Sequence, residues 1–123
     1  MTIFVATSKR FYEEAERIVK LIKACGVIVH HPYFHLDPTA IDTDPDYKSR
    51  VTLQHFPEID DCDVFYALLP DGYIGCSVTI ELAYAYAKGK EIVVSEAPAE
   101  FAVRALVTEV SGPDKFIARF ERG

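Results

Sequence analysis

Short apolar runs alternate along the chain with segments in which apolar residues recur every three or four positions. The apolar runs lie within Thr2–Ala6, Val27–Val29, Asp63–Pro70 and Glu91–Ser95. Runs of this length predict buried strands, and the periodic segments between them predict helices. Strands that alternate with helices indicate a parallel sheet covered on both faces.

The first helix is predicted between the first two strands. Its apolar positions recur at helical spacing, at Phe11, Ala15, Ile18, Ile22 and Cys25. Thr7 or Ser8 can cap its start, and Gly26 can end it. Strand, helix and strand within about 30 residues form a βαβ unit, whose right-handed crossover makes the two strands parallel.

Two more helices are predicted on either side of the third strand. One covers Tyr47–Asp61, where Pro57 should divide or kink it. The other follows a Pro-Asp-Gly turn and begins near Cys76 or Ser77.

The C-terminal part is predicted to add one helix and one strand. The helix covers Pro98–Val110, Gly112 and Pro113 break it, and Lys115–Phe120 forms a strand at the edge of the sheet. Residues 1–123 are therefore expected to form a single three-layer α/β/α domain. Its fold class is flavodoxin-like (Rossmann-like), with a parallel sheet of about five strands.

The segment His30–Asp46 has three prolines, four aspartates and no periodicity, which predicts a long loop. His30, His31, His35 and Asp37 are of residue types that bind zinc or iron. Their spacing matches no closed metal motif, and histidines after a strand also line clefts or cap backbone groups. Neither a metal nor another cofactor is predicted.

The amino-acid composition limits which kinds of protein and which kinds of partner are possible. A chain of 123 residues, 50% hydrophobic, can bury a core without disulfides. Three cysteines without a CxxC pair indicate reduced thiols and a cytoplasmic setting. No apolar run approaches the roughly 20 residues that span a bilayer, and the start is too quickly polar for a secretory signal. No membrane partner is expected.

The formal net charge of −6 argues against a nucleic-acid polymer as partner, because no basic face matches the phosphate field. A single small phosphate stays compatible with this charge, since it needs only local N–H groups and one or two cations. The expected partner is therefore a small molecule.

One carboxylate stands out in the helix after the third strand. Glu81 is the only acidic residue between Asp71 and Lys88, and apolar residues flank it. It is either a partly exposed residue favoured by the helix N-terminus or a buried functional group. In a parallel sheet, ligands bind at the carboxyl ends of the strands, and Glu81 is expected to face that crevice.

Three ordered blocks carry a family resemblance: IFVATSKR, CDVFYALLP and GCSVTIELAYAYAKGKEIVV. With them the chain resembles the nucleoside 2-deoxyribosyltransferase superfamily, including its 2′-deoxynucleoside 5′-monophosphate N-glycosidases. The resemblance extends over most of the chain and leaves out the His30–Asp46 loop.

The resemblance implies that Glu81 is the nucleophile. A carboxylate beside C1′ stabilises an oxocarbenium-like transition state or forms a glycosyl ester. The family has an Asp as the acid at the position of His55, so His55 either takes over that role or marks altered or lost chemistry. Asp71 is a second candidate acid.

The resemblance also implies substrate-binding residues. Ser8 matches a phosphate-binding serine and is equally an N-cap candidate, and Lys9 and Arg10 can add charge beside it. Phe4 stands where the monophosphate-cleaving branch has a tyrosine near the sugar.

Three further positions come from the same resemblance. Gly75 and Ser77 match the turn whose backbone approaches sugar or phosphate. Arg104 matches a position that completes the site of a neighbouring subunit, which would make the active unit a homodimer or larger oligomer. Arg104 is otherwise an ordinary surface residue.

Two functions follow from these residues. The first is an enzyme that cleaves the N-glycosidic bond of a nucleoside or nucleoside 5′-monophosphate, by hydrolysis or by 2-deoxyribosyl transfer to another base. The second is a non-catalytic module of the same fold that binds a nucleotide, which the residues at His55 and Phe4 favour.

Overall fold

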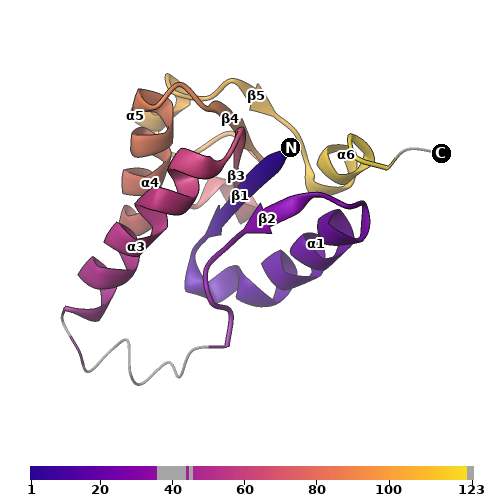
Figure 1. Cartoon of the computed structure of the whole chain (residues 1–123). Coiled ribbons are helices and arrows are strands. Elements are labelled where there is room, and N and C mark those ends of the chain that lie inside the picture. Colours follow the sequence, from indigo (N-terminus) through magenta and orange to yellow (C-terminus); the bar gives the residue numbers. More distant parts are fainter. Residues whose placement is uncertain (36–43, 45, 122–123) are drawn as a thin grey trace.

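A computed structural model of the protein describes residues 1–35, 44 and 46–121. Within them, five strands form one sheet in the order β2-β1-β3-β4-β5, and all the pairs are parallel (Figure 1). The strands are β1 (Thr2–Thr7), β2 (Ile28–His30), β3 (Val64–Leu68), β4 (Glu91–Val94) and β5 (Glu109–Val110). This is the flavodoxin-like strand order, so the predicted fold class is confirmed.

Helices cover both faces of this sheet. They are α1 (Tyr12–Ala24), α3 (Tyr47–Asp61), α4 (Cys76–Ala87), α5 (Phe101–Arg104) and α6 (Pro113–Ala118), with short 3-10 helices η1 (Lys9–Phe11) and η2 (Pro70–Gly72). α1 and α6 lie on one face, and α3, α4 and α5 lie on the other (Figure 1). The three layers are those that the sequence predicts.

Two hydrophobic cores result, one on each face of the sheet. Successive strand residues point to opposite faces, so Ile3 and Val5 pack with Ile18 of α1, whereas Phe4 and Ala6 pack in the core that contains residues of α3 and α4. β1 and β3 are buried in both cores and carry the turns at their carboxyl ends. A rigid centre therefore positions those turns.

The helix predicted over Pro98–Val110 is wrong for most of its length. Only α5 is helical, and Glu109–Val110 is the edge strand β5 beside β4. The Thr108 amide donates to the Ile92 carbonyl at 2.8 Å, and the Ser111 amide donates to the Val94 carbonyl at 2.8 Å. Valine and threonine near the end of the segment suit an extended edge, where these ladder bonds replace helical ones.

The predicted edge strand over Lys115–Phe120 is also wrong, because this segment lies in and just after α6. Pro113 stands at the start of the helix, where its missing N–H costs nothing. Phe116 and Phe120 are four residues apart and do not alternate with polar residues as a half-buried strand would. Phe116 stacks on Tyr66 of β3 with ring centroids 4.0 Å apart, so α6 covers the sheet instead of extending it.

α3 is not divided at Pro57, since the helix is continuous from Tyr47 to Asp61. The proline is exposed and removes a single backbone hydrogen bond. Across the described residues, no helix is long and apolar enough to pass through a bilayer.

Candidate active site

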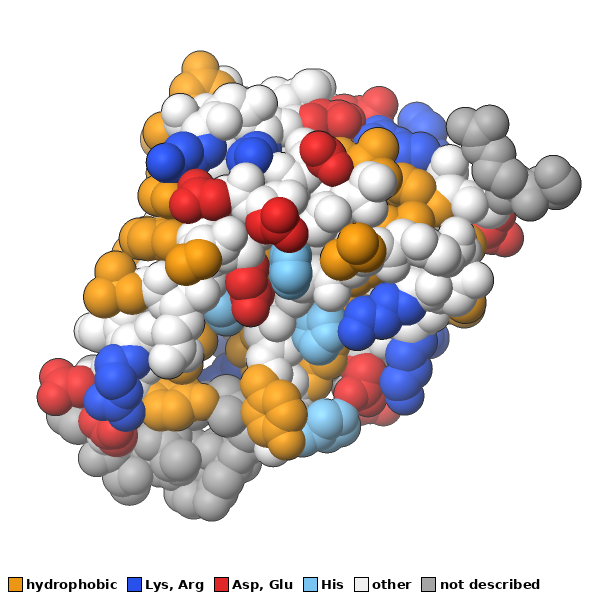
Figure 2. All heavy atoms as spheres, in the orientation of Figure 1, with side chains coloured by type: hydrophobic (Ala, Val, Ile, Leu, Met, Phe, Trp, Pro, Cys, Tyr) orange, Lys and Arg blue, Asp and Glu red, His pale blue; other side chains and the backbone are white. Residues whose placement is uncertain are grey.

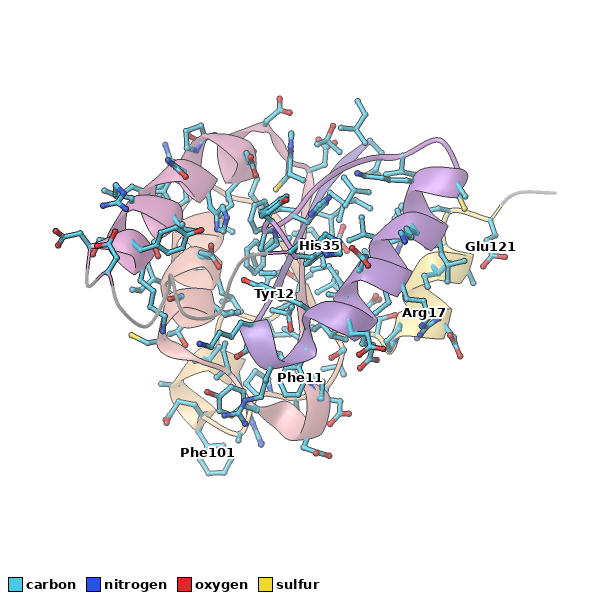
Figure 3. All side chains as sticks on the ribbon, turned by 90° about the horizontal axis from the view of Figure 1, so that it is seen from below. Phe11, Tyr12, Arg17, His35, Phe101 and Glu121 are labelled. Atoms are coloured by element: carbon cyan, nitrogen blue, oxygen red, sulfur yellow. The ribbon has the colours of Figure 1, made fainter. Side chains whose placement is uncertain are left out.

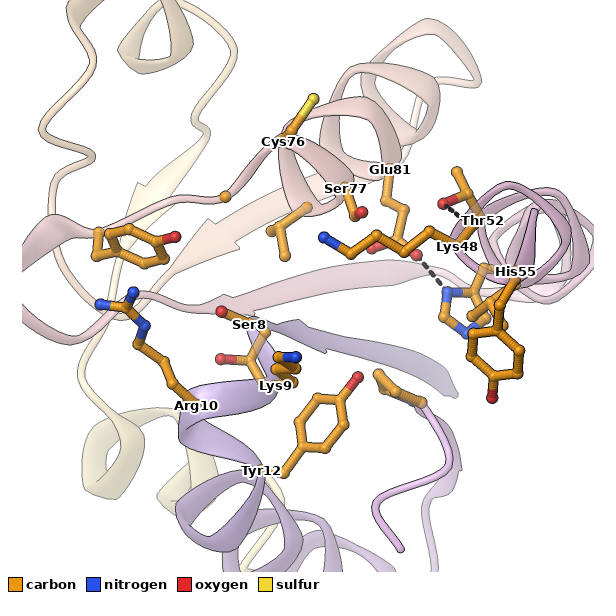
Figure 4. A pocket seen from close by; sticks show the side chains of 17 residues that line it. Ser8, Lys9, Arg10, Tyr12, Lys48, Thr52, His55, Cys76, Ser77 and Glu81 are labelled. Carbon is orange, nitrogen blue, oxygen red and sulfur yellow. Dashed lines mark hydrogen bonds and ion pairs between the residues drawn. The ribbon is translucent and has the colours of Figure 1, made fainter. Parts of the chain in front are cut away.

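A cleft of about 260 Å³ opens where β1 and β3 end. It is lined by the turn after β1, the start of α1, one face of α3 and the first turns of α4 (Figure 4). β2 and β3 pair with opposite edges of β1, so the connections from β1 and from β3 diverge here. This is the switch point at which open parallel sheets bind ligands.

Glu81 faces this cleft from α4 and, among the residues that the structure describes, is the only acidic one that lines it. Its side chain is 5% exposed, and that of His55 is 12% exposed. The Nδ1–H group of His55 donates a hydrogen bond to Oε2 of Glu81, because a carboxylate oxygen can only accept (Figure 4). The carboxylate is therefore buried, oriented and paired.

Phe4 packs against the His55 ring of this pair. Its ring is fully buried and meets the His55 ring edge-on, with centroids 5.3 Å apart and an angle of 63°. Phe4 is not among the residues that line the cleft. It packs against the imidazole and is not placed for a direct contact with a ligand.

Three cationic side chains line the same cleft: Lys9, Arg10 and Lys48. The guanidinium of Arg10 lies 4.2 Å from the ring centroid of Tyr73, which fixes it against the turn before α4. The described lining residues thus include one carboxylate and three cations, although the chain as a whole is acidic. Such a cleft favours an anionic ligand.

The N-terminus of α4 also borders the cleft. Gly75 is its N-cap and provides no side-chain cap, so the first amides of the helix, at Cys76 and Ser77, lack an acceptor within the helix. Opposite them, Ser8 stands before η1, and its hydroxyl makes no capping hydrogen bond. Amides and hydroxyl together suit a phosphate oxygen.

Sequence reasoning missed several cleft residues, among them Tyr12 and Lys48. Burial, and then the charge of Glu81, raise the pKa of Tyr12 to about 12, so the phenol stays protonated at neutral pH. Helical spacing gave a usable signal for Lys48: Lys48, Thr52 and His55 are spaced i, i+4 and i+7 and share one face of α3. For Tyr12, the signal is its position four residues after Ser8.

Comparison with models of known protein families and with curated proteins gave no match. Solved structures do match over nearly the whole chain. A conserved protein from Enterococcus faecalis superposes with a TM-score of 0.74 at 16% identity, covering 98% of this chain and 96% of that one. A 2-deoxyribosyltransferase from Bacillus psychrosaccharolyticus gives a TM-score of 0.64 at 14% identity, covering 98% and 96%.

A third match is the Clostridium botulinum CMP N-glycosidase BcmB, with a TM-score of 0.60 at 19% identity, covering 97% of this chain and 96% of that one. The chain has the fold of these enzymes. The resemblance stated from the three sequence blocks is therefore confirmed at the level of the fold.

Besides Phe4, two further candidate residues, Asp71 and Arg104, lie outside the cleft lining. Asp71 is exposed in η2, with a φ of 57°. Arg104 donates from Nε to the Pro98 carbonyl at 2.6 Å and lies 4.4 Å from the ring centroid of Phe101, which points away from the protein (Figure 3). Ser8, Lys9, Gly75 and Ser77 do line the cleft with Glu81 and His55.

The histidines near β2 are paired individually and not gathered around one point. Histidine side chains lie over β2 and the segment after it, with acidic side chains beside them (Figure 2). His30 pairs with Asp61 at 3.0 Å, and His35 pairs with Glu16 at 2.5 Å. Among the described residues, no group of three or more potential ligands could bind a metal ion. Asp37 lies outside the described residues.

Proposed function

We propose that the protein is an enzyme that cleaves the N-glycosidic bond of a nucleoside or nucleoside 5′-monophosphate, by hydrolysis or by 2-deoxyribosyl transfer to another base. The observation that carries this proposal is the buried carboxylate of Glu81, which faces the cleft and is hydrogen-bonded by His55. The fold shared with a CMP N-glycosidase and a 2-deoxyribosyltransferase supports it.

The first step requires a proton on His55 that can pass to the base and an ionised carboxylate at Glu81. A Glu81 oxygen bonds to C1′ as the C1′–N bond breaks, and the electron pair of that bond goes to the departing base. Ester formation removes the negative charge of Glu81, which weakens its hold on the His55 proton. The proton then passes to the base, leaving His55 neutral.

The second step releases the sugar. Water attacks C1′, its proton goes to His55, and the C1′–O bond to Glu81 breaks to restore the carboxylate and the imidazolium. If a second base occupies the position of the first, its nitrogen attacks C1′ in place of water and the reaction is a transfer. Burial of the pair favours the first step, because a poorly solvated carboxylate is a stronger nucleophile.

The other end of the cleft suits the 5′-phosphate of a nucleotide. Ser8, Arg10 and the amides at the start of α4 offer hydrogen bonds and positive charge on the same side of Glu81 (Figure 4). Lys9 adds a further cation to this lining. A nucleoside 5′-monophosphate is therefore the preferred form of the substrate in this proposal.

The test is release of free base from a panel of ribo- and 2′-deoxynucleosides and their 5′-monophosphates, followed by liquid chromatography. Glu81→Gln keeps the size of the side chain and the hydrogen bond to His55 while removing the nucleophile. We expect release by the parent and a loss of about 10³-fold or more in the variant. Adding a second base to the reaction separates the transferase from the hydrolase.

The same panel tests the alternative, a nucleotide-binding module. A module of that kind would gain thermal stability with a nucleotide, leave it intact, and keep the gain in Glu81→Gln. No release of base from any compound, at enzyme concentrations that register slow turnover, contradicts the enzymatic proposal.

We further propose that the active form is a homo-oligomer in which Arg104 of one copy reaches the cleft of another. Arg104 does not line the cleft of its own chain, which is compatible with this role. Sedimentation equilibrium tests the assembly, and Arg104→Gln tests the contribution of the side chain to turnover. A monomer with full activity would contradict this proposal.

A further inference from the structure

Tyr12 is the first residue of α1 and projects its hydroxyl into the cleft from the side opposite α4 (Figure 4). Its ring packs edge-on against Phe34, with centroids 5.3 Å apart and an angle of 65°. This packing and the helical backbone fix the direction of the side chain. The hydroxyl is therefore held in place before any ligand binds.

Within the described part of the chain, the Tyr12 hydroxyl has no hydrogen-bond partner of its own. Tyr12 and Glu81 line the cleft from opposite sides (Figure 4), and the charge of Glu81 contributes to the raised pKa of Tyr12. The phenol stays protonated up to strongly alkaline pH. Its hydroxyl can therefore donate a hydrogen bond to a ligand group in the space beside Glu81.

The position of Glu81 defines what occupies that space. In the proposed function, C1′ of the substrate must lie against a Glu81 oxygen, and the sugar hydroxyls lie within a few bonds of C1′. The groups suited to a phosphate, Ser8 and Arg10, lie farther along the cleft (Figure 4). The group that Tyr12 meets is therefore part of the sugar.

We infer that Tyr12 is a positioning residue that donates a hydrogen bond from its hydroxyl to a hydroxyl of the furanose ring, fixing C1′ against Glu81. This inference rests on the proposed function. It also gives the chain a sugar contact that Phe4 does not supply, since Phe4 has no hydroxyl and lies outside the cleft lining.

The experiment combines Tyr12→Phe with substrates that differ only in the sugar. Ribo-, 2′-deoxy- and 3′-deoxynucleoside 5′-monophosphates of one base are compared by kcat/KM for the parent and the variant. Tyr86→Phe is the matched control, because Tyr86 lies on α4, is exposed and does not line the cleft. We expect Tyr12→Phe to lower kcat/KM about 3- to 10-fold on sugars that retain the recognised hydroxyl.

On the one analogue that lacks this hydroxyl, Tyr12→Phe should have almost no effect, and Tyr86→Phe should have none on any sugar. An equal loss on all three sugars, as a merely structural role would cause, overturns the inference. So does the absence of any loss while the parent is active.

If the parent releases no base at all, the proposed function fails and the role of Tyr12 is judged by binding. Calorimetric titration of the same three nucleotides into Glu81→Gln, with and without Tyr12→Phe, gives that measurement. A loss of affinity restricted to sugars with the recognised hydroxyl supports the contact. An affinity unchanged by Tyr12→Phe, or reduced equally for all three, contradicts it.

Discussion

His55 and Glu81, 26 residues apart in the sequence, are joined by a partly buried hydrogen bond that links α3 to α4. Burying the charged form of either residue without the other would cost free energy, since an unpaired buried charge loses its hydration. The pair therefore contributes to the stability of the protein as well as to the proposed chemistry. The two contributions can be separated by mutation.

His55→Ala should lower the free energy of unfolding by about 3 kcal/mol, because it leaves the Glu81 carboxylate buried without its donor. Adding Glu81→Gln to His55→Ala should recover part of this loss, since a neutral amide is cheaper to bury. Urea unfolding of the parent, both single variants and the double variant gives the coupling energy, expected at about 1–3 kcal/mol. Additive effects of the two changes would show that the residues do not interact.

Arg10→Gln should weaken the use of a nucleoside 5′-monophosphate while leaving that of the nucleoside nearly unchanged. Loss of one charge-assisted hydrogen bond raises KM for the monophosphate by about 10-fold. Lys20→Gln is the control, because it makes the same change in net charge at a side chain that is 75% exposed on α1 and outside the cleft lining. Equal effects of the two variants, or equal effects on both substrates, would exclude a local contact with phosphate.

Tyr66→Phe should lower the free energy of unfolding by about 1–2 kcal/mol at neutral pH. The Tyr66 hydroxyl donates to the Ser111 carbonyl at 2.9 Å, and both residues are buried, so the variant leaves that carbonyl without its donor. Urea unfolding at pH 7 measures this loss. A loss below about 0.5 kcal/mol would contradict it.

The same variant should alter the response to alkali. Burial raises the pKa of Tyr66, so the unfolded chain loses the phenol proton above pH 10 while the folded chain keeps it. This part of the stability is fully present below pH 10 and declines as the pH rises toward the folded value. The urea midpoint of the parent should fall between pH 9 and pH 11, and it should fall less steeply in Tyr66→Phe.

Gly72→Ala should destabilise the turn after β3 by about 3 kcal/mol. Gly72 has a φ of 76°, and a Cβ there would lie 2.7 Å from the Ala97 carbonyl oxygen. Gly89 has the same φ but open space around it, so Gly89→Ala should cost only the backbone penalty of about 1 kcal/mol. Both variants introduce the same backbone strain, and only Gly72→Ala adds the steric contact. Thermal unfolding of the two variants therefore measures the effect of that contact, and equal losses of stability would contradict it.

The sequence predicted the fold where the hydrophobic pattern was strong. The runs at β1, β3 and β4 are apolar over three or more consecutive residues, and α1 has a clear apolar face, so their types and order were predictable. The C-terminal elements were not. Phe116 could be assigned only once α6 was seen to pack on Tyr66, because apolar residues in such short segments fit a strand or a helix equally.

The residues of the candidate site also fall into two groups, those that a local sequence signal indicates and those that only packing brings to the cleft. A lone acidic residue in an apolar helix indicated Glu81, and the family resemblance of two short sequence blocks indicated Ser8 and Gly75, because each of these signals is local. For Tyr12 and Lys48 the local signals are weak: the helical spacing of Lys48 from His55 and the position of Tyr12 shortly after Ser8 do not by themselves indicate a site. These two residues join the cleft only because the strand order brings α1 and α3 to opposite sides of it.

The sequence by itself therefore determined the alternation of strands and helices, the parallel sheet and the position of one carboxylate near its carboxyl edge. Periodicity, turn residues and helix ends act over a few neighbouring residues, which is why they can be recognised in the chain. Only the tertiary structure decided that His55 meets Glu81, that Phe4 supports the imidazole and that Asp71 and Arg104 lie outside the cleft lining. Those relationships depend on sheet order and on packing between residues far apart in sequence, and no local pattern encodes them.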